Sequence, residues 1–187
     1  MTDSNKRSYY RVNDKVALIA RKIEPGRVSP NELFERRIRE TGISNRFIHE
    51  RAKKRPSLLS IERRYPEVAS YIEYLEDKIQ ALASYTSSDQ SPLPMTPDHD
   101  VSLSASGLSF NSRADYAVGD QLEITMRLFP SRMVVYVIAT VTRREPVGGK
   151  GLWEIGVKYT HIHEDDREQL FQQVNHVQTD SLKVVVN

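Results

Sequence analysis

The chain has 187 residues, of which 39% are hydrophobic and 28% are charged. This length fits one domain, or one domain with an accessory element, and the modest apolar content favours one core plus a solvated appendage. Cysteine is absent, which excludes disulfides and thiolate metal sites, and no apolar run is long enough to span a membrane. Because the N-terminus also lacks a signal-peptide pattern, we expect a cytoplasmic protein.

The charge is divided unevenly along the chain, although the net charge is only +2. Residues 1–64 contain 17 Lys and Arg against 8 Asp and Glu, whereas residues 65–187 contain 10 against 17. This asymmetry indicates an anionic partner for the first half or pairing of opposite surfaces between subunits. The arginines of 27–64 are explained equally well if they only keep helix surfaces in contact with water. Among possible anionic partners, nucleic acid is the least favoured.

The first predicted element is a strand over Val12–Lys22, which an Arg-x-x-x-Arg pair, Arg7 and Arg11, immediately precedes. A spacing of four places both guanidinium groups on one side of the backbone in either an extended or a helical segment. Each can pair two donors with a phosphate or with the O6/N7 edge of guanine. Such a pair is common on protein surfaces, so the spacing alone is weak evidence for a ligand site.

A helix is predicted to begin after Ser29, which has the character of an N-cap. Pro30 suits the first helical position and Glu32 completes a capping box. We expect this Arg-rich helical segment to be interrupted at Gly42 and broken at Pro56.

Residues 58–85 then show a heptad pattern, with apolar or aromatic side chains at Leu58, Ile61, Tyr65, Val68, Ile72, Leu75, Ile79 and Leu82. Pro66 either disturbs this helix or opens a second one, which would make 66–85 its reliable part. The pattern favours self-association through Val68, Ile72, Leu75, Ile79 and Leu82. Packing on the chain's own preceding helix is the alternative, but that helix has a poorer apolar stripe. Three heptads determine the number of subunits only weakly.

The segment from Tyr85 to Asp98 is rich in proline and small polar residues and is predicted to be a linker. Sheet follows, with candidate strands at His99–Asn111, Gln121–Phe129, Met133–Glu145 and Leu152–Ile162. A closing helix is expected from Glu164, because three acidic residues suit its N-terminal end. The sequence thus predicts a mainly β fold, a small antiparallel barrel with inserted helices and a C-terminal helix.

A second motif, Ser102-Leu103-Ser104-Ala105-Ser106-Gly107, lies on the first of these later strands. Together with the arginine pair ahead of the first strand, it resembles the PilZ domain, a bacterial six-stranded barrel that binds cyclic di-GMP. The resemblance divides the chain into 1–22 (arginine motif and first strand), 23–98 (helical insertion and linker) and 99–187 (remainder of the barrel and closing helix). It also resembles family members in which an inserted heptad helix mediates oligomerisation.

The resemblance implies that Arg7 and Arg11 contact guanines and phosphates, and that Ser104 and Gly107 match the serine and glycine of the second motif. Ser102 stands where the family has Asp or Asn. A hydroxyl cannot grip the N1–N2 side of guanine with two acceptors, and losing one such bond lowers affinity roughly tenfold to a hundredfold.

The resemblance implies a bacterial receptor for cyclic di-GMP in motility, pilus or biofilm control, without enzymatic activity or another cofactor. The inserted helices would join subunits into a homo-oligomer and transmit the bound state to a protein whose identity the sequence does not give. A degenerate barrel that binds protein partners without nucleotide is the alternative, and Ser102 favours it. We expect no metal site, because His161 and His163 have no third firm ligand in the sequence.

Overall fold

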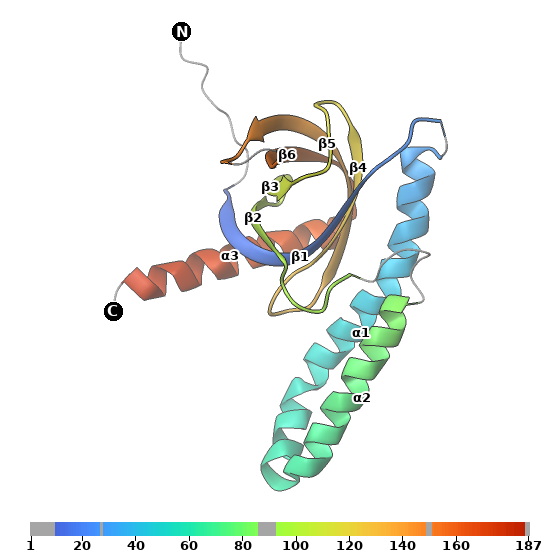
Figure 1. Ribbon diagram of the computed structural model, residues 1–187. Coiled ribbons are helices and arrows are strands. Elements are labelled where there is room, and N and C mark those ends of the chain that lie inside the picture. The colour runs from blue at the N-terminus through green and yellow to red at the C-terminus, as the bar shows by residue number, and fades with distance from the viewer. Residues whose placement is uncertain (1–9, 27, 86–92, 149–150, 186–187) are drawn as a thin grey trace.

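The structure, a computed structural model, describes residues 10–26, 28–85, 93–148 and 151–185. Six antiparallel strands close into a barrel in the order β1-β2-β3-β6-β5-β4 (Figure 1). Their bounds are β1 (Val12–Lys22), β2 (His99–Ser104), β3 (Gly107–Ser112), β4 (Gln121–Arg127), β5 (Val134–Pro146) and β6 (Trp153–Ile162). The prediction of a small antiparallel barrel with inserted helices is therefore confirmed.

The segment expected to form one strand over His99–Asn111 is two strands, so that expectation was wrong. The chain reverses at Ala105-Ser106, and β2 pairs with β3 from Val101 opposite Phe110 to Ser104 opposite Gly107. Two-residue hairpin turns are recognised mainly by Asn-Gly or Gly-rich pairs, and Ala-Ser is not one of them. The alternation of apolar residues continues through the turn, which hides the reversal.

The barrel is filled by inward-facing aliphatic and aromatic side chains, including Leu103, Leu108, Leu122, Ile124, Met126, Val137 and Ile155. The closing helix α3 (Glu164–Val185) begins at the predicted residue and adds Leu170 and Val174 to this core. Gln173 of α3 is buried, and its amide nitrogen donates to Asp14 Oδ2 and to the carbonyl of Phe129, each at 2.7 Å. These contacts hold α3 against the barrel.

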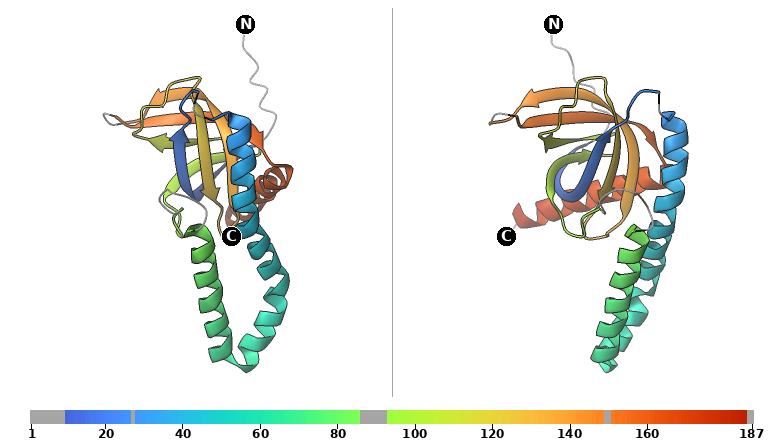
Figure 2. Two further views of the ribbon diagram at one scale, coloured as in Figure 1. Left: turned by 90° about the vertical axis from the view of Figure 1, so that its right-hand side faces the viewer. Right: turned by 45° about the vertical axis from the view of Figure 1, so that its right-hand side comes forward.

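Helix α1 (Pro30–Arg64) begins with the predicted capping box: Glu32 N donates to Ser29 Oγ at 3.2 Å, and Ser29 N donates to Glu32 Oε2 at 3.4 Å. The expected interruption at Gly42 and break at Pro56 were wrong, because the helix continues through both. A proline removes one helical hydrogen bond and bends a helix without ending it when the rest of the helix is held in place. Figure 2 shows α1 bent along its length.

Helix α2 (Pro66–Tyr85) returns alongside the second half of α1, so Pro66 opens a second helix, as one of the two readings of the heptad segment proposed. Leu58 and Ile61 consequently lie on α1, and only the later heptad positions share α2. The two helices form a hairpin that extends away from the barrel (Figures 1 and 2). No helix within the described ranges is both long enough and apolar enough to cross a membrane.

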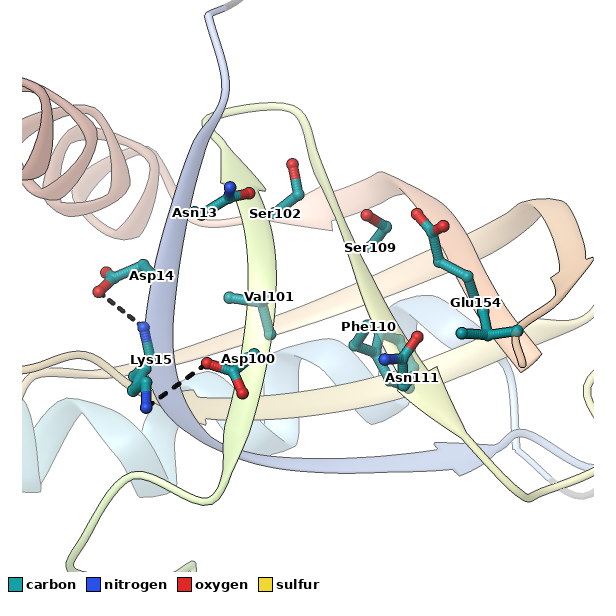
Figure 3. A pocket seen from close by; sticks show the side chains of 11 residues that line it. Asn13, Asp14, Lys15, Asp100, Val101, Ser102, Ser109, Phe110, Asn111 and Glu154 are labelled. Carbon is teal, nitrogen blue, oxygen red and sulfur yellow. Dashed lines mark hydrogen bonds and ion pairs between the residues drawn. The ribbon is translucent and has the colours of Figure 1, made fainter. Parts of the chain in front are cut away.

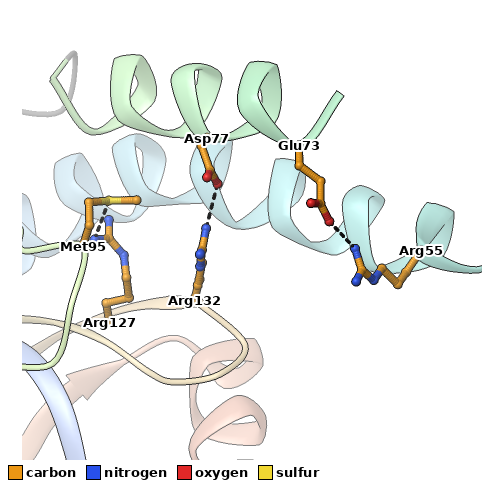
Figure 4. Close-up of polar contacts among 6 residues, drawn as sticks. All are labelled: Arg55, Glu73, Asp77, Met95, Arg127 and Arg132. Carbon is orange, nitrogen blue, oxygen red and sulfur yellow. Dashed lines mark hydrogen bonds and ion pairs between the residues drawn. The ribbon is translucent and has the colours of Figure 1, made fainter. Parts of the chain in front are cut away.

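Both helices of the hairpin contact the barrel. The first turns of α1 pack Leu33 against Tyr136 and Ile138 of β5, and Arg37 Nε pairs with Glu123 Oε1 at 2.9 Å. Near the other end, Arg132 Nη1 pairs with Asp77 Oδ1 of α2 at 2.8 Å (Figure 4). Buried Arg127 donates to the carbonyls of Leu93 and Pro94, which fastens the end of the linker to β4.

Candidate functional site

The turn between β2 and β3 is built around the hydroxyl of Ser104. This side chain is 1% exposed; its Oγ donates to the carbonyl of Gly107 at 2.9 Å and accepts from Ser106 N at 3.4 Å. Tyr159 N donates to the carbonyl of Ser106 at 3.0 Å, which ties the turn to β6. The motif serine therefore has a structural role that fixes the shape of the turn.

Gly107 is required by a close approach of two backbones. A Cβ at this position would lie 2.3 Å from the carbonyl oxygen of Val157 on β6, well inside van der Waals contact. Gly107 pairs with Lys158, and the absent side chain lets β3 approach β6 this closely. The glycine of the motif is thus explained by packing alone, and any contact with a ligand would be additional.

Arg11 lies beside this turn. β1 begins with Val12 opposite Leu103, so the register continued by one residue places Arg11 opposite Ser104. Burial raises the pKa of the hydroxyl of Tyr159, a residue of β6, and the positive charge of Arg11 lowers the same pKa. The guanidinium of Arg11 therefore also lies near β6. The structure therefore brings Arg11, Ser104 and Gly107 together. Arg7 lies outside the described residues.

A row of polar side chains crosses the outer face of the barrel next to Arg11. The register pairs Asn13 with Ser102 and Ser102 with Ser109, and the row continues to Gly156 of β6. Asn13, Ser102 and Ser109 line a groove of about 510 Å³ over β1, β2, β3 and β6, shown in Figure 3. Ser102 is half-buried within this groove, two residues from Ser104 on the same face.

The groove and its arginine end differ in charge. Asp14, Asp100 and Glu154 line the groove, and the cation that lines it with them, Lys15, pairs with Asp100 Oδ1 at 3.8 Å (Figure 3). At the turn, Arg167 Nη1 of α3 donates to the carbonyl of Ala105 at 3.3 Å, so a second guanidinium lies at the turn that Arg11 adjoins. An anionic group fits the turn end better than the acidic groove, where it would be repelled.

Arg167 is the residue that sequence reasoning missed. It lies about sixty residues beyond the motif, in the first turn of the closing helix, where the neighbouring acidic residues indicate only a helix start. Its Nε also pairs with Glu164 Oε2 at 3.6 Å. Nothing in the local sequence connects it to the turn, because its position depends on how α3 docks against the barrel.

The residues expected to mediate self-association are the α2 seam, defined as Val68, Ile72, Leu75, Ile79 and Leu82. Four of them are exposed in the single chain: Val68 by 51%, Leu75 by 41%, Ile79 by 48% and Leu82 by 65%. Ile72 is half-buried, and α2 instead buries Ala69. The alternative, packing on the chain's own α1, is met in part, because α2 runs alongside α1, whereas the four exposed side chains remain uncovered in the single chain.

The described residues contain no group of three potential metal ligands. His161 Nε2 contacts Asn31 Oδ1 at 2.6 Å, and His163 Nδ1 lies 3.7 Å from Asp165 Oδ2. Each of these two histidine rings therefore contacts a polar side chain.

The family model for the PilZ domain matches residues 78–176, more than half of the chain. The chain belongs to the PilZ domain family. The match begins within α2, contains β2 to β6 and ends in α3. A search of curated proteins finds no significant relative.

The chain is similar to several solved structures at low sequence identity. A Xanthomonas campestris protein described as a tetrameric PilZ domain self-assembled via a helical bundle has a TM-score of 0.50 and 12% identity, covering 94% of this chain and 92% of that one. The Bacillus subtilis inhibitor of motility MotI/DgrA has a TM-score of 0.39 and 18% identity, covering 43% and 42%. The PilZ domain of Escherichia coli YcgR, solved with c-di-GMP, has a TM-score of 0.37 and 13% identity, covering 48% and 77%.

Proposed function

We propose that this PilZ protein is a bacterial receptor that binds cyclic di-GMP at the β2–β3 turn and the adjoining groove. Family membership associates the chain with cyclic di-GMP-related signalling. The observation that supports binding by this chain is the position of Arg11 directly beside the Ser104–Gly107 turn, although the two segments are about ninety residues apart in sequence.

In this proposal the ligand is divided between two chemical environments. Its phosphates lie at the turn, where the guanidinium groups of Arg11 and Arg7 pair with their oxygens. A guanine lies along the groove, where Ser102 offers a hydroxyl and the acidic lining suits the N1–H and N2–H₂ donors of the base. Ser104 and Gly107 shape the turn against which the ligand packs.

The α2 seam is proposed to join copies of the chain. Four exposed apolar side chains on one stripe of a solvent-facing helix form an unusual surface for a monomer, and a second copy of the same seam would cover it. The receptor is proposed to act without catalysis, as a cytoplasmic module whose bound state a partner protein reads.

A degenerate adaptor that binds proteins without nucleotide is the second candidate. The observation that favours it is that Ser104 and Gly107 both have structural roles within the barrel, so the motif would persist without a ligand. The two candidates differ in a single measurement, which is nucleotide affinity.

Isothermal titration calorimetry of the purified chain with cyclic di-GMP tests the proposal. We expect binding in the wild type and a loss of affinity of about tenfold to a hundredfold in Arg11→Ala, because a charge-assisted contact to phosphate or guanine disappears. Arg113→Ala is the matched control, since it removes an equal charge from an exposed arginine beyond the far end of β3. No heat with the wild type at high micromolar ligand, or unchanged affinity in Arg11→Ala, would reject the proposed site.

A further inference from the structure

We propose that Asn13 supplies the guanine-recognising amide of this site, in place of an acidic or amide side chain at position 102. The inference rests on the proposed binding of cyclic di-GMP. It assigns base recognition to β1, the strand that follows the arginine motif, in addition to the serine motif of β2.

The strand register places Asn13 directly opposite Ser102. Directly opposed residues of antiparallel strands point to the same face, with their Cβ atoms about 5 Å apart. Val12 and Val16 point into the core, so Asn13 faces outward, and its side chain is exposed. Figure 3 shows the amide of Asn13 beside the hydroxyl of Ser102, both lining the groove.

The chemistry of guanine explains why the hydroxyl alone is insufficient. The base presents two adjacent donors, N1–H and N2–H₂, next to the O6 acceptor. Ser102 has one short hydroxyl, whereas the amide of Asn13 offers Oδ1 as an acceptor and Nδ2 as a donor on a longer side chain. Within the described part of the chain the Asn13 side chain makes no hydrogen bond, so its amide is available to a ligand.

The other candidate side chains of the groove lie further from the arginine end. Asp100 and Asn111 belong to the next row of outward positions, about 7 Å along the strands from Ser102. Asp100 also pairs with Lys15. Of these polar side chains Asn13 is the nearest to Arg11, which lies two residues earlier, just before β1 begins, so one nucleotide can reach both.

Titration calorimetry with cyclic di-GMP on four variants of the full chain tests the assignment. Asn13→Ala is expected to weaken binding about tenfold, because the base loses its amide partner. Asn111→Ala, the same substitution one row away on the same face, is expected to leave affinity unchanged. Thermal melts of each variant confirm that the barrel remains folded.

A rescue experiment separates recognition from a structural effect of the substitution. Adding Ser102→Asp to Asn13→Ala is expected to restore affinity, since a carboxylate in the same row replaces the lost acceptor. Ser102→Asp alone is expected to gain less than about threefold. Wild-type affinity in Asn13→Ala, or failure of Ser102→Asp to rescue it, would overturn the assignment while leaving the receptor proposal intact. Absence of binding by the wild type would instead reject the proposed function itself.

Discussion

The most direct perturbation of the proposed assembly is Leu75→Asp in the middle of the α2 seam. Leu75 is 41% exposed in the single chain, so an aspartate there remains hydrated in the monomer and should not unfold it. Within an interface formed by two seams, the same aspartate would be removed from water without a partner. The substitution therefore separates assembly from folding.

The magnitude follows from the exposed surface of the seam. Burying the exposed half of a valine, leucine or isoleucine contributes about 1 kcal/mol, and an unpaired carboxylate costs several kcal/mol to bury. In a symmetric dimer both copies carry the change, so the free energy of association should fall by at least about 3 kcal/mol. That corresponds to a dissociation constant raised more than about a hundredfold.

Sedimentation velocity over a range of protein concentrations measures this change. Ser70→Asp is the matched control, because it adds the same charge to an exposed position of α2 about 140° around the helix from Leu75. We expect Ser70→Asp to assemble as the wild type does and Leu75→Asp to sediment as a monomer. A wild type that is monomeric at every concentration, or a Leu75→Asp variant that still assembles, would refute the reasoning.

Two further predictions concern the barrel. Gly107→Ala forces a Cβ to within 2.3 Å of the carbonyl oxygen of Val157, so it should lower the Tm measured by calorimetry by about 5–10 °C. The control Ser102→Ala should change the Tm little. Equal Tm values for the two variants would exclude the close approach. Burial raises the pKa of Asp166 to about 6, with Asp165 adding to the rise and His163 opposing it. Between about pH 4 and pH 6 the carboxyl group of Asp166 is protonated in the folded state but ionised in the unfolded chain. The free energy of unfolding should therefore fall as the pH rises through this range, by about 3 kcal/mol in total. Asp166→Asn should remove most of that fall in urea denaturation at pH 4 and pH 7, and an unchanged pH dependence would contradict the assignment.

The strands and caps of this fold were predictable because each depends on local chemistry. Val12–Lys22 matches β1, and Ser29, Pro30 and Glu32 form the predicted cap. The errors lie where tertiary contacts override local preference. α1 passes Pro56 because its first turns are fixed to the barrel and its second half packs against α2. The reversal at Ala105-Ser106 depends on the Ser104 hydroxyl and on β6, neither of which the local pattern reveals.

The candidate site was predictable only in part. The sequence placed Arg11, Ser104 and Gly107 in one site through a family resemblance, and the register agrees with that grouping. The proximity of Asn13 to Ser102 and of Arg167 to the turn depends on strand pairing and on the docking of α3. Such relationships across about ninety or sixty residues have no signature in the spacing of residues along the chain.

The topology relates the two proposed functions, because the helical hairpin is inserted between the two strands that carry the site. β1 runs from Arg11 toward α1, and β2 runs from the linker after α2 to Ser104. From Ala17 onward β1 is paired with β4, as part of a closed barrel that contains no free edge. A closed barrel deforms little, and coupling between sites requires an element with two alternative arrangements, which the described residues do not show.

We therefore expect nucleotide binding and self-association to be nearly independent within residues 10–185. Saturating cyclic di-GMP should change the dissociation constant for assembly by less than about threefold, because the proposed ligand site contains neither the seam nor the Asp77–Arg132 joint. Sedimentation equilibrium with and without ligand measures this, and Arg132→Ala tests whether the joint contributes. A tenfold shift on ligand addition that Arg132→Ala abolishes would show instead that the barrel transmits the bound state through this joint to the hairpin.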